Sequence, residues 1–132
     1  MNILVLYDDE YVVLPDGAGI DRPRLAGNVS TDEMYPVRYC NLTENFEEAA
    51  LTGFRTQKIA LGELQALCCD CLVMGENAGC GSAREHAAVC LYDAGIRLVC
   101  AVSFNATFRR NLINCGCVPT ANFPVLQDKK TS

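Results

Sequence analysis

Positive charge is scarce in this sequence, and no basic run occurs in it. The 132 residues include 11 Lys and Arg against 16 Asp and Glu, which gives a net charge of −5 and an isoelectric point near 4.7. Nucleic acid and anionic membrane surfaces repel an acidic chain that has no basic patch. We therefore expect neither nucleic acid nor a membrane as a partner.

Long apolar runs are absent as well. No stretch approaches the roughly 20 apolar residues of a membrane-spanning helix, and residues 1–15 are too short and too acidic for a signal peptide. Internal repeats and low-complexity tracts are also missing. A chain of this length can bury about two-thirds of its unfolded surface without disulfides or metal, so we predict one domain over residues 1–132, in the cytoplasm.

The cysteines lack the spacing of a disulfide framework. They number nine, an odd set, and several lie inside apolar segments. Cys68, Cys69 and Cys71 include a C-x-x-C spacing that could bind zinc or carry redox chemistry, but no second ligand pair of matching spacing accompanies it. The alternative is that the cysteines fill the core as small apolar side chains. Cys80 differs, because it lies in a glycine-rich loop where an exposed thiol is open to oxidation.

That glycine-rich loop, residues 75–82, is the most informative feature. Residues 71–74 before it predict a short buried strand, and the glycines allow the backbone to turn tightly. An amphipathic helix is predicted to begin near Ala83 and to stop at Gly95. Its apolar stripe would consist of Ala83, Ala87, Cys90, Leu91 and Ala94.

A loop that leads into a helix in this way is suited to binding an anion. Free N–H groups and the positive dipole end at a helix N-terminus attract phosphate or carboxylate. Arg84 adds a planar fork that can hold a carboxylate by two hydrogen bonds. Ser82 would then lie where the anion binds, or would act only as the N-cap of the helix.

Other apolar patterns predict strands and helices on both sides of this loop. Strands are expected at residues 3–7, 11–14 and 96–102, and a short helix at 61–68. A helix capped by Thr43 and ended by Gly53 would bury Phe46, Ala49 and Ala50. A helix capped by Ser103 and closed by Gly116 would carry Phe104, Phe108 and Leu112 on one side. This alternation implies parallel strands and an α/β fold, with the loops after the strands gathered at one sheet edge.

Three motifs occur in a fixed order. They are NVSTDEMYPVRY at residues 28–39, GCGSAREHAA at 79–88, and AVSF at 101–104 followed by RRNLINCG at 109–116. Together they resemble the swivel domain, or small subunit, of the aconitase superfamily, with the closest likeness to 3-isopropylmalate dehydratase small subunits. Asn41-Leu-Thr resembles the archaeal-type members. The resemblance covers roughly residues 28–119 and implies a swivelling β/β/α domain with a partly parallel sheet and flanking helices.

The resemblance also implies an activity and a partner. Members of the family remove and return water on a hydroxy di- or tricarboxylic acid, as 3-isopropylmalate dehydratase does in leucine biosynthesis. The small subunit works in a heteromer whose large subunit carries a [4Fe-4S] cluster as a Lewis acid. We expect this chain to bind no metal or cofactor itself, and to be inactive without that large subunit.

Individual residues match the family's site. Ser82 matches the serine that takes a proton from the carbon next to a carboxylate, and Arg84 matches the arginine that holds a substrate carboxylate. Ala83 stands where most relatives have a second serine, which removes one hydrogen bond to substrate. The remaining expected contacts to substrate are Gly81, Thr31, Asp32 and Arg38, with ordinary helix capping as the alternative for Thr31 and Asp32.

His86, the single histidine, is expected to orient its neighbours by a hydrogen bond more than to transfer a proton itself. Arg84 would lie in the first helical turn, where a cation opposes the helix dipole, and this suggests an anion for it to hold. The alternative is a solvated or structural arginine.

Two departures from the family pattern lead to a further expectation. Residues 1–27 add atypical strands at the start, and the chain ends soon after Pro124, where typical small subunits continue into further strands. We expect the N-terminal strands to fill the vacant sheet positions, since an exposed apolar edge invites aggregation, and residues 125–132 to form a polar tail.

Three alternative functions remain at this point. The chain could be a non-catalytic anion-binding or regulatory swivel domain, the small subunit of a homoaconitase or methylmalate-type hydratase, or a thiol or metal protein built around Cys68–Cys71. The sequence does not specify the hydroxy acid or the stoichiometry of the complex.

Overall fold

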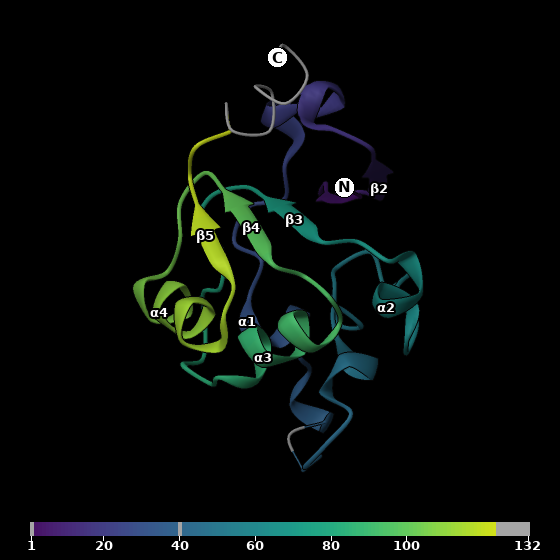
Figure 1. Ribbon diagram of the computed structural model, residues 1–132, viewed down its shortest axis with the longest axis vertical. Helices are drawn as coiled ribbons and strands as arrows, with labels where there is room; N and C mark the ends of the chain where they lie inside the picture. Colours follow the sequence, from purple (N-terminus) through teal and green to yellow (C-terminus); the bar gives the residue numbers. More distant parts are fainter. Residues whose placement is uncertain (1, 40, 124–132) are drawn as a thin grey trace.

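Short apolar runs form the centre of the fold. In the computed structural model, which describes residues 2–39 and 41–123, a five-stranded sheet has the order β2-β1-β3-β4-β5 (Figure 1). Its strands are β1 (Ile3–Leu6), β2 (Tyr11–Leu14), β3 (Cys71–Met74), β4 (Leu98–Ala101) and β5 (Val118–Thr120). β1, β3, β4 and β5 are parallel, and β2 is antiparallel to β1. The predicted α/β class with a partly parallel sheet is confirmed.

Helices flank this sheet. The α-helices are α1 (Thr31–Met34), α2 (Glu63–Leu67), α3 (His86–Asp93) and α4 (Ala106–Cys115), and short 3-10 helices span Gly17–Gly19, Arg22–Arg24, Val37–Tyr39 and Phe46–Ala49. α3 and α4 pack against each other (Figure 1). Gly95 and Gly116 follow them with positive φ angles of 108° and 109°, so both predicted glycine stops are confirmed.

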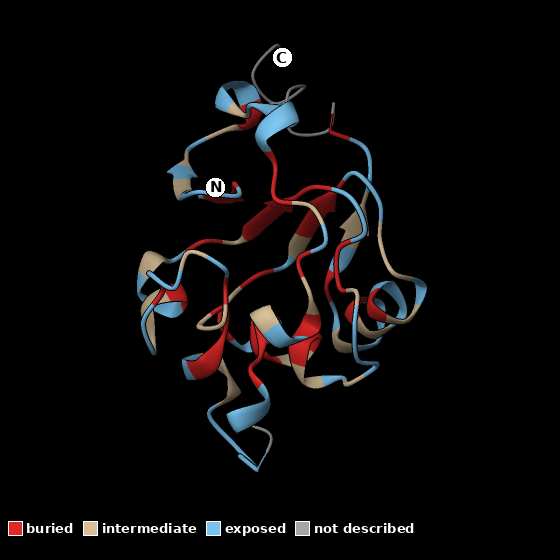
Figure 2. Ribbon diagram, turned by 180° about the vertical axis from the view of Figure 1, so that it is seen from behind, coloured by how far each residue is buried: buried red, intermediate tan, exposed pale blue. Residues whose placement is uncertain are grey.

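Alternate residues of the central strands belong to two apolar layers. Leu4 and Leu6 of β1 pack into the cluster that contains the buried faces of α3 and α4, whereas Ile3 and Val5 belong to a second cluster with Leu25 and Phe123. Because both faces are covered, β1 is buried along its whole length, as is β3 (Figure 2). A strand covered on both faces reads as a continuous apolar run, which is why the sequence revealed these strands.

Two helix starts were predicted too early. α3 begins at His86, so Ala83 is exposed and does not belong to the apolar stripe, and Ser82 does not cap the helix. α4 begins at Ala106, and its N-cap is Asn105, whose side chain accepts hydrogen bonds from the next N–H groups. In both cases the serine hydroxyl that suggested a cap accepts a hydrogen bond from another group. Ser103 accepts from the Asn77 N–H at 2.8 Å, and Ser82 accepts from Arg84.

The helix predicted from Thr43 to Gly53 is wrong. This stretch contains only the short 3-10 helix Phe46–Ala49, which follows Asn45 in the left-handed region at φ 59°. Leu51 also has a positive φ of 61°, and its N–H donates to the Met34 carbonyl at 2.7 Å. A long-range hydrogen bond to α1 therefore replaces the next helical turn, while Ala49 and Ala50 are buried as expected.

The N-terminal strands, the domain boundaries and the C-terminal tail were the remaining expectations about how the chain is organised. β1 and β2 join the sheet beside β3, and whether they replace strands of the relatives stays a prediction. The single domain over residues 1–132 also stays a prediction, and the polar tail at 125–132 lies outside the described residues. No helix within residues 2–39 or 41–123 is both long and apolar enough to cross a membrane.

Each cysteine in the described part of the chain is a free thiol, and most are buried. Burial raises the pKa of Cys100 to about 11 and that of Cys117 to about 12, so both thiols stay protonated near neutral pH. Cys71 is buried and Cys68 is exposed, so the C-x-x-C pair divides between core and surface. This favours cysteines as small core side chains.

The close approach of α4 to the glycine-rich loop gives a first prediction. Gly79 has φ +82°, and a Cβ atom there would overlap the Phe108 side chain. Strain and overpacking together should make Gly79→Ala lower the free energy of unfolding by at least about 3 kcal/mol, measured by urea titration. The control is Gly62→Ala, because Gly62 has φ +77° and open space around it, and should cost only about 1 kcal/mol. Equal losses would contradict this packing.

Candidate functional site

The glycine-rich loop after β3 lies along the segment that leads into α1. The Gly79 N–H donates to the Val29 carbonyl at 2.8 Å, and the Thr31 N–H donates to the Cys80 carbonyl at 2.9 Å. Ser30 and Cys80 form a parallel bridge. These backbone bonds join two of the three sequence motifs, and the third is joined by the bridge between Ala78 and Phe104. The predicted meeting of loops after the strands is confirmed.

Ser82 is fixed by this arrangement on its backbone side. Its N–H donates to Thr31 Oγ1 at 3.1 Å, and Thr31 is 2% exposed. The hydroxyl of Ser82 remains at the surface and accepts hydrogen bonds from the Arg84 N–H at 3.3 Å and the Arg84 Nε at 3.1 Å. The side chain therefore faces a cation instead of capping α3.

Arg84 lies two residues before α3 and not in its first turn, so the expected clash with the helix dipole does not apply. Its guanidinium contacts the Ser82 hydroxyl through Nε and pairs with the Asp32 carboxylate at 3.8 Å. Asp32 in turn accepts the Val37 N–H at 2.9 Å. The side chain of Arg84 is about one-quarter exposed, so the group remains reachable from solvent.

The predicted site residues of α1 therefore contact the predicted site residues of the glycine-rich loop. Thr31 and Asp32 are consecutive residues of α1. Thr31 accepts a hydrogen bond from the Ser82 backbone, whereas Asp32 pairs with the Arg84 side chain. Ser30 precedes them as the N-cap, with a capping box to Glu33. Capping and site geometry are therefore carried by different residues of the same turn.

Arg38 lies in the same region, beside a cavity that Asp32 also lines. Its guanidinium lies 4.9 Å from the centre of the Tyr39 ring. A mainly polar cavity of about 400 Å³ lies next to it, with the lining residues Asp32, Pro36, Arg38, Thr52, Gly53 and Gln57. Asp32 therefore borders the cavity that Arg38 lines and also pairs with Arg84.

Gly81 and Ala83 shape the backbone around Ser82. Gly81 has φ +98°, and a Cβ atom there would lie 3.5 Å from Thr31 Oγ1. Ala83 is exposed, and its carbonyl accepts a hydrogen bond from Asn111 Nδ2 of α4 at 3.3 Å. The sequence reasoning missed Asn111. Asn111 lies in sequence between Phe108 and Leu112, which are both buried, and this position could have indicated that it borders the packed side of α4.

His86, the first residue of α3, packs among aromatic rings. Its ring stacks on Tyr35 with centroids 5.3 Å apart, and it meets Phe46 in a T-shaped arrangement with centroids 5.6 Å apart. Nδ1 of His86 is buried and has no hydrogen-bond partner among the described residues. The histidine therefore supports the start of α3 by packing, and its expected role as an orienting hydrogen-bond partner stays a prediction.

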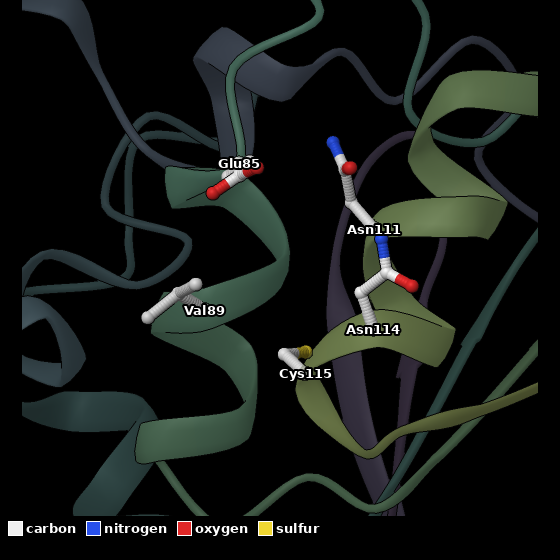
Figure 3. Close-up of a pocket in the computed structure, with 5 residues that line it drawn as sticks. All are labelled: Glu85, Val89, Asn111, Asn114 and Cys115. Atoms are coloured by element: carbon white, nitrogen blue, oxygen red, sulfur yellow. The ribbon is translucent and has the colours of Figure 1, made fainter.

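A second cavity lies between α3 and α4. It is lined by Glu85, which precedes α3, by Val89 of α3, and by Asn111, Asn114 and Cys115 of α4 (Figure 3), and it has a volume of about 210 Å³. One carboxylate, two amides and no cation line it. A carboxylate ligand would be repelled by Glu85 there, so the anion site is better placed at Ser82 and Arg84.

Comparisons with known proteins agree with these motifs. The family model for the aconitase C-terminal domain matches residues 64–123. The 3-isopropylmalate dehydratase small subunit of Anaeromyxobacter dehalogenans is 35% identical over 111 residues, which cover 77% of this chain and 58% of that protein. The protein of the same name from Brachyspira hyodysenteriae is 40% identical over 94 residues, covering 67% and 53%.

A solved structure gives the same result. The 3-isopropylmalate dehydratase structure from Methanocaldococcus jannaschii superposes with a TM-score of 0.59 at 33% identity, covering 71% of this chain and 55% of that one. The chain spans about half the length of the curated relatives it matches. The sequence motifs, the sheet with its flanking helices and these similarities together show that the chain belongs to the aconitase superfamily, in the family of 3-isopropylmalate dehydratase small subunits.

Proposed function

We propose that this chain is the small subunit of an aconitase-type hydro-lyase. The complex would remove and return water on a hydroxy di- or tricarboxylic acid resembling 3-isopropylmalate. The observation that carries the proposal is the contact of the Ser82 hydroxyl with the Arg84 guanidinium, on a loop whose backbone is bound to Thr31. The names of the relatives support the substrate class.

Ser82 is the proposed catalytic base. A free serine is a very weak base, so its alkoxide must be stabilised before it can take a proton from carbon. Arg84 supplies that stabilisation, because its backbone N–H and its Nε both donate to the Ser82 oxygen. The alkoxide takes the proton from the carbon next to a substrate carboxylate, and the electron pair of that C–H bond becomes the new double bond as the hydroxyl leaves.

Arg84 has the second proposed role, which is to hold a substrate carboxylate. Nε is engaged by Ser82, and the pairing with Asp32 is long at 3.8 Å, so a carboxylate can replace the Asp32 contact at the outer nitrogens. Gly81 and Ala83 would border the same ligand. Arg38, which lines the polar cavity together with Asp32, would provide a second cation for a further polar group of the substrate.

The partner is proposed to be a large subunit that carries the [4Fe-4S] cluster. Among residues 2–39 and 41–123, no three His, Cys, Asp or Glu side chains are grouped so that they could hold a metal ion. Cluster binding needs several converging thiolates, and the buried cysteines described above do not fit that requirement. Lewis-acid chemistry at the leaving hydroxyl would come from the partner. A cytoplasmic location stays a prediction.

The Ser82 role can be tested in the complex reconstituted with its large subunit. Ser82→Ala should lower kcat by about a thousandfold or more with little change in KM, because the hydroxyl acts in proton transfer and not in holding substrate. Steady-state kinetics measures both values. Ser103→Ala is the matched control, since the Ser103 hydroxyl also accepts a loop N–H, from Asn77, and its loss should leave turnover within about threefold.

Near-normal turnover in Ser82→Ala would contradict the proposal. A complex of the unchanged proteins that bound hydroxy acids without turning them over would show instead that the chain is an anion-binding swivel domain.

Substitutions of Arg84 test whether substrate binding needs the planar guanidinium or only a positive charge. Arg84→Lys should raise KM and lower kcat/KM by about 10- to 1000-fold, and Arg84→Gln should lower it further. Because Arg84 lies outside α3 and is partly exposed, both changes should leave the melting temperature of the chain nearly unchanged. Arg110→Lys, at an exposed position of α4, is the control. A large stability loss with unchanged kinetics would show that Arg84 is only a structural ion-pair partner.

A further inference from the structure

We propose that Arg55, acting through Glu33, is a positioning residue for the Ser82–Arg84 site. This inference rests on the function proposed above. Neither residue was singled out from the sequence, and neither hydrogen-bonds to Ser82 in the structure. Their importance comes from what they fix, which is the short helix α1.

The Glu33 carboxylate is held from several directions. One oxygen accepts hydrogen bonds from the Ser30 N–H at 3.2 Å and from Arg55 Nη2 at 3.0 Å. The other oxygen accepts the Arg55 backbone N–H and the Arg55 Nε, both at 3.0 Å. The Glu33 side chain is 18% exposed, so these paired bonds are shielded from much of the competing water.

Arg55 also connects parts of the chain that are far apart in sequence. Its Nη1 pairs with Asp8, just past β1, at 2.8 Å, and its Nη2 donates to the carbonyl of Gly27, just before α1, at 2.8 Å. The hydrogen bonds that the guanidinium donates to Glu33 raise the pKa of Arg55, so its charge is permanent. One guanidinium therefore ties the end of β1, the entry to α1 and α1 itself together.

Helix α1 needs such support because it spans only Thr31–Met34. A single helical turn is not stable alone and takes its position from tertiary contacts. The backbone of the 51–57 loop lies directly against it: a Cβ atom on Gly53 would be 2.7 Å from the Asp32 carbonyl. Arg55 is the residue of that loop whose guanidinium binds the Glu33 carboxylate of α1.

The link to the site follows from what α1 presents. Thr31 binds the Ser82 N–H, and Asp32 pairs with Arg84. A shift of α1 would move both contacts together, and a displacement of about 1 Å is enough to cost on the order of 100-fold in a catalytic rate. Arg55 thus acts on the reacting groups without touching them.

Arg24 offers a matched control. It too carries two carboxylate partners, Asp9 at 3.1 Å and Glu10 at 2.9 Å, and it lies over the Tyr7 ring. Its side chain is 44% exposed, against 30% for Arg55. Both arginines make ion pairs in the segment after β1, but those of Arg24 do not include Glu33.

The first measurement is steady-state kinetics of the reconstituted complex. Arg55→Gln should lower kcat by about 10- to 100-fold, and Arg24→Gln should leave it within about twofold. Arg55→Lys keeps the charge and should restore part of the loss. Full activity in Arg55→Gln would overturn the proposal, as would an equal loss in Arg24→Gln.

The second measurement needs no activity. Amide hydrogen exchange of the full chain, followed by NMR, reports the Thr31 and Gly79 N–H groups that join the α1 segment to the loop. In Arg55→Gln these amides should exchange at least about tenfold faster while the amides of β3 stay as slow as in the unchanged protein. Arg24→Gln should alter neither group.

The two measurements separate this inference from the proposed function. If Arg55→Gln speeds exchange at Thr31 and Gly79 while the complex of the unchanged protein has no hydro-lyase activity, the positioning role is supported and the proposed function is refuted. Unchanged exchange at both amides would overturn the positioning role whatever the kinetics.

Discussion

The site depends on the docking of the glycine-rich loop onto the segment that enters α1. Two backbone hydrogen bonds, Gly79 to Val29 and Thr31 to Cys80, fix the loop, and the Thr31 hydroxyl then accepts the Ser82 N–H. Without this pairing, Ser82 and Arg84 would belong to an exposed turn with no reason to adopt one geometry. With it, residues about 50 positions apart in the chain form one polar surface at an edge of the sheet.

The apolar interior gives that edge its rigidity. β1 and β3 are buried on both faces, and the cysteines add small side chains to the packing instead of crosslinks. Charged groups are kept to the rim, where Arg55 joins α1 to the end of β1. A stable sheet thus supports a polar site whose side chains remain reachable from solvent, as the proposed role beside a large subunit requires.

β1 and β3 could be predicted because burial on two faces leaves a plain apolar run, and the helix ends could be predicted because Gly95 and Gly116 adopt positive φ. β5 was not predicted, because its three residues are not buried and give no such run. The helix starts could not, since a serine hydroxyl near a helix can serve other donors, as Ser82 serves Arg84. The stretch after Thr43 failed because Leu51 bonds to Met34, a contact that no local pattern encodes. Resemblance identified Ser82 and Arg84, but only the fold connects them to Thr31, Asp32 and Arg55.

The most direct test of the account is a titration of this chain into the cluster-loaded large subunit, with hydration of the unsaturated acid measured at each ratio. Ser82 and Arg84 form the proposed proton-transfer half of the site, and the described cysteines do not converge to hold a cluster. The account predicts no activity from either protein alone and a rate that rises to saturation as they combine. Full activity of the large subunit without this chain, or of this chain by itself, would contradict it.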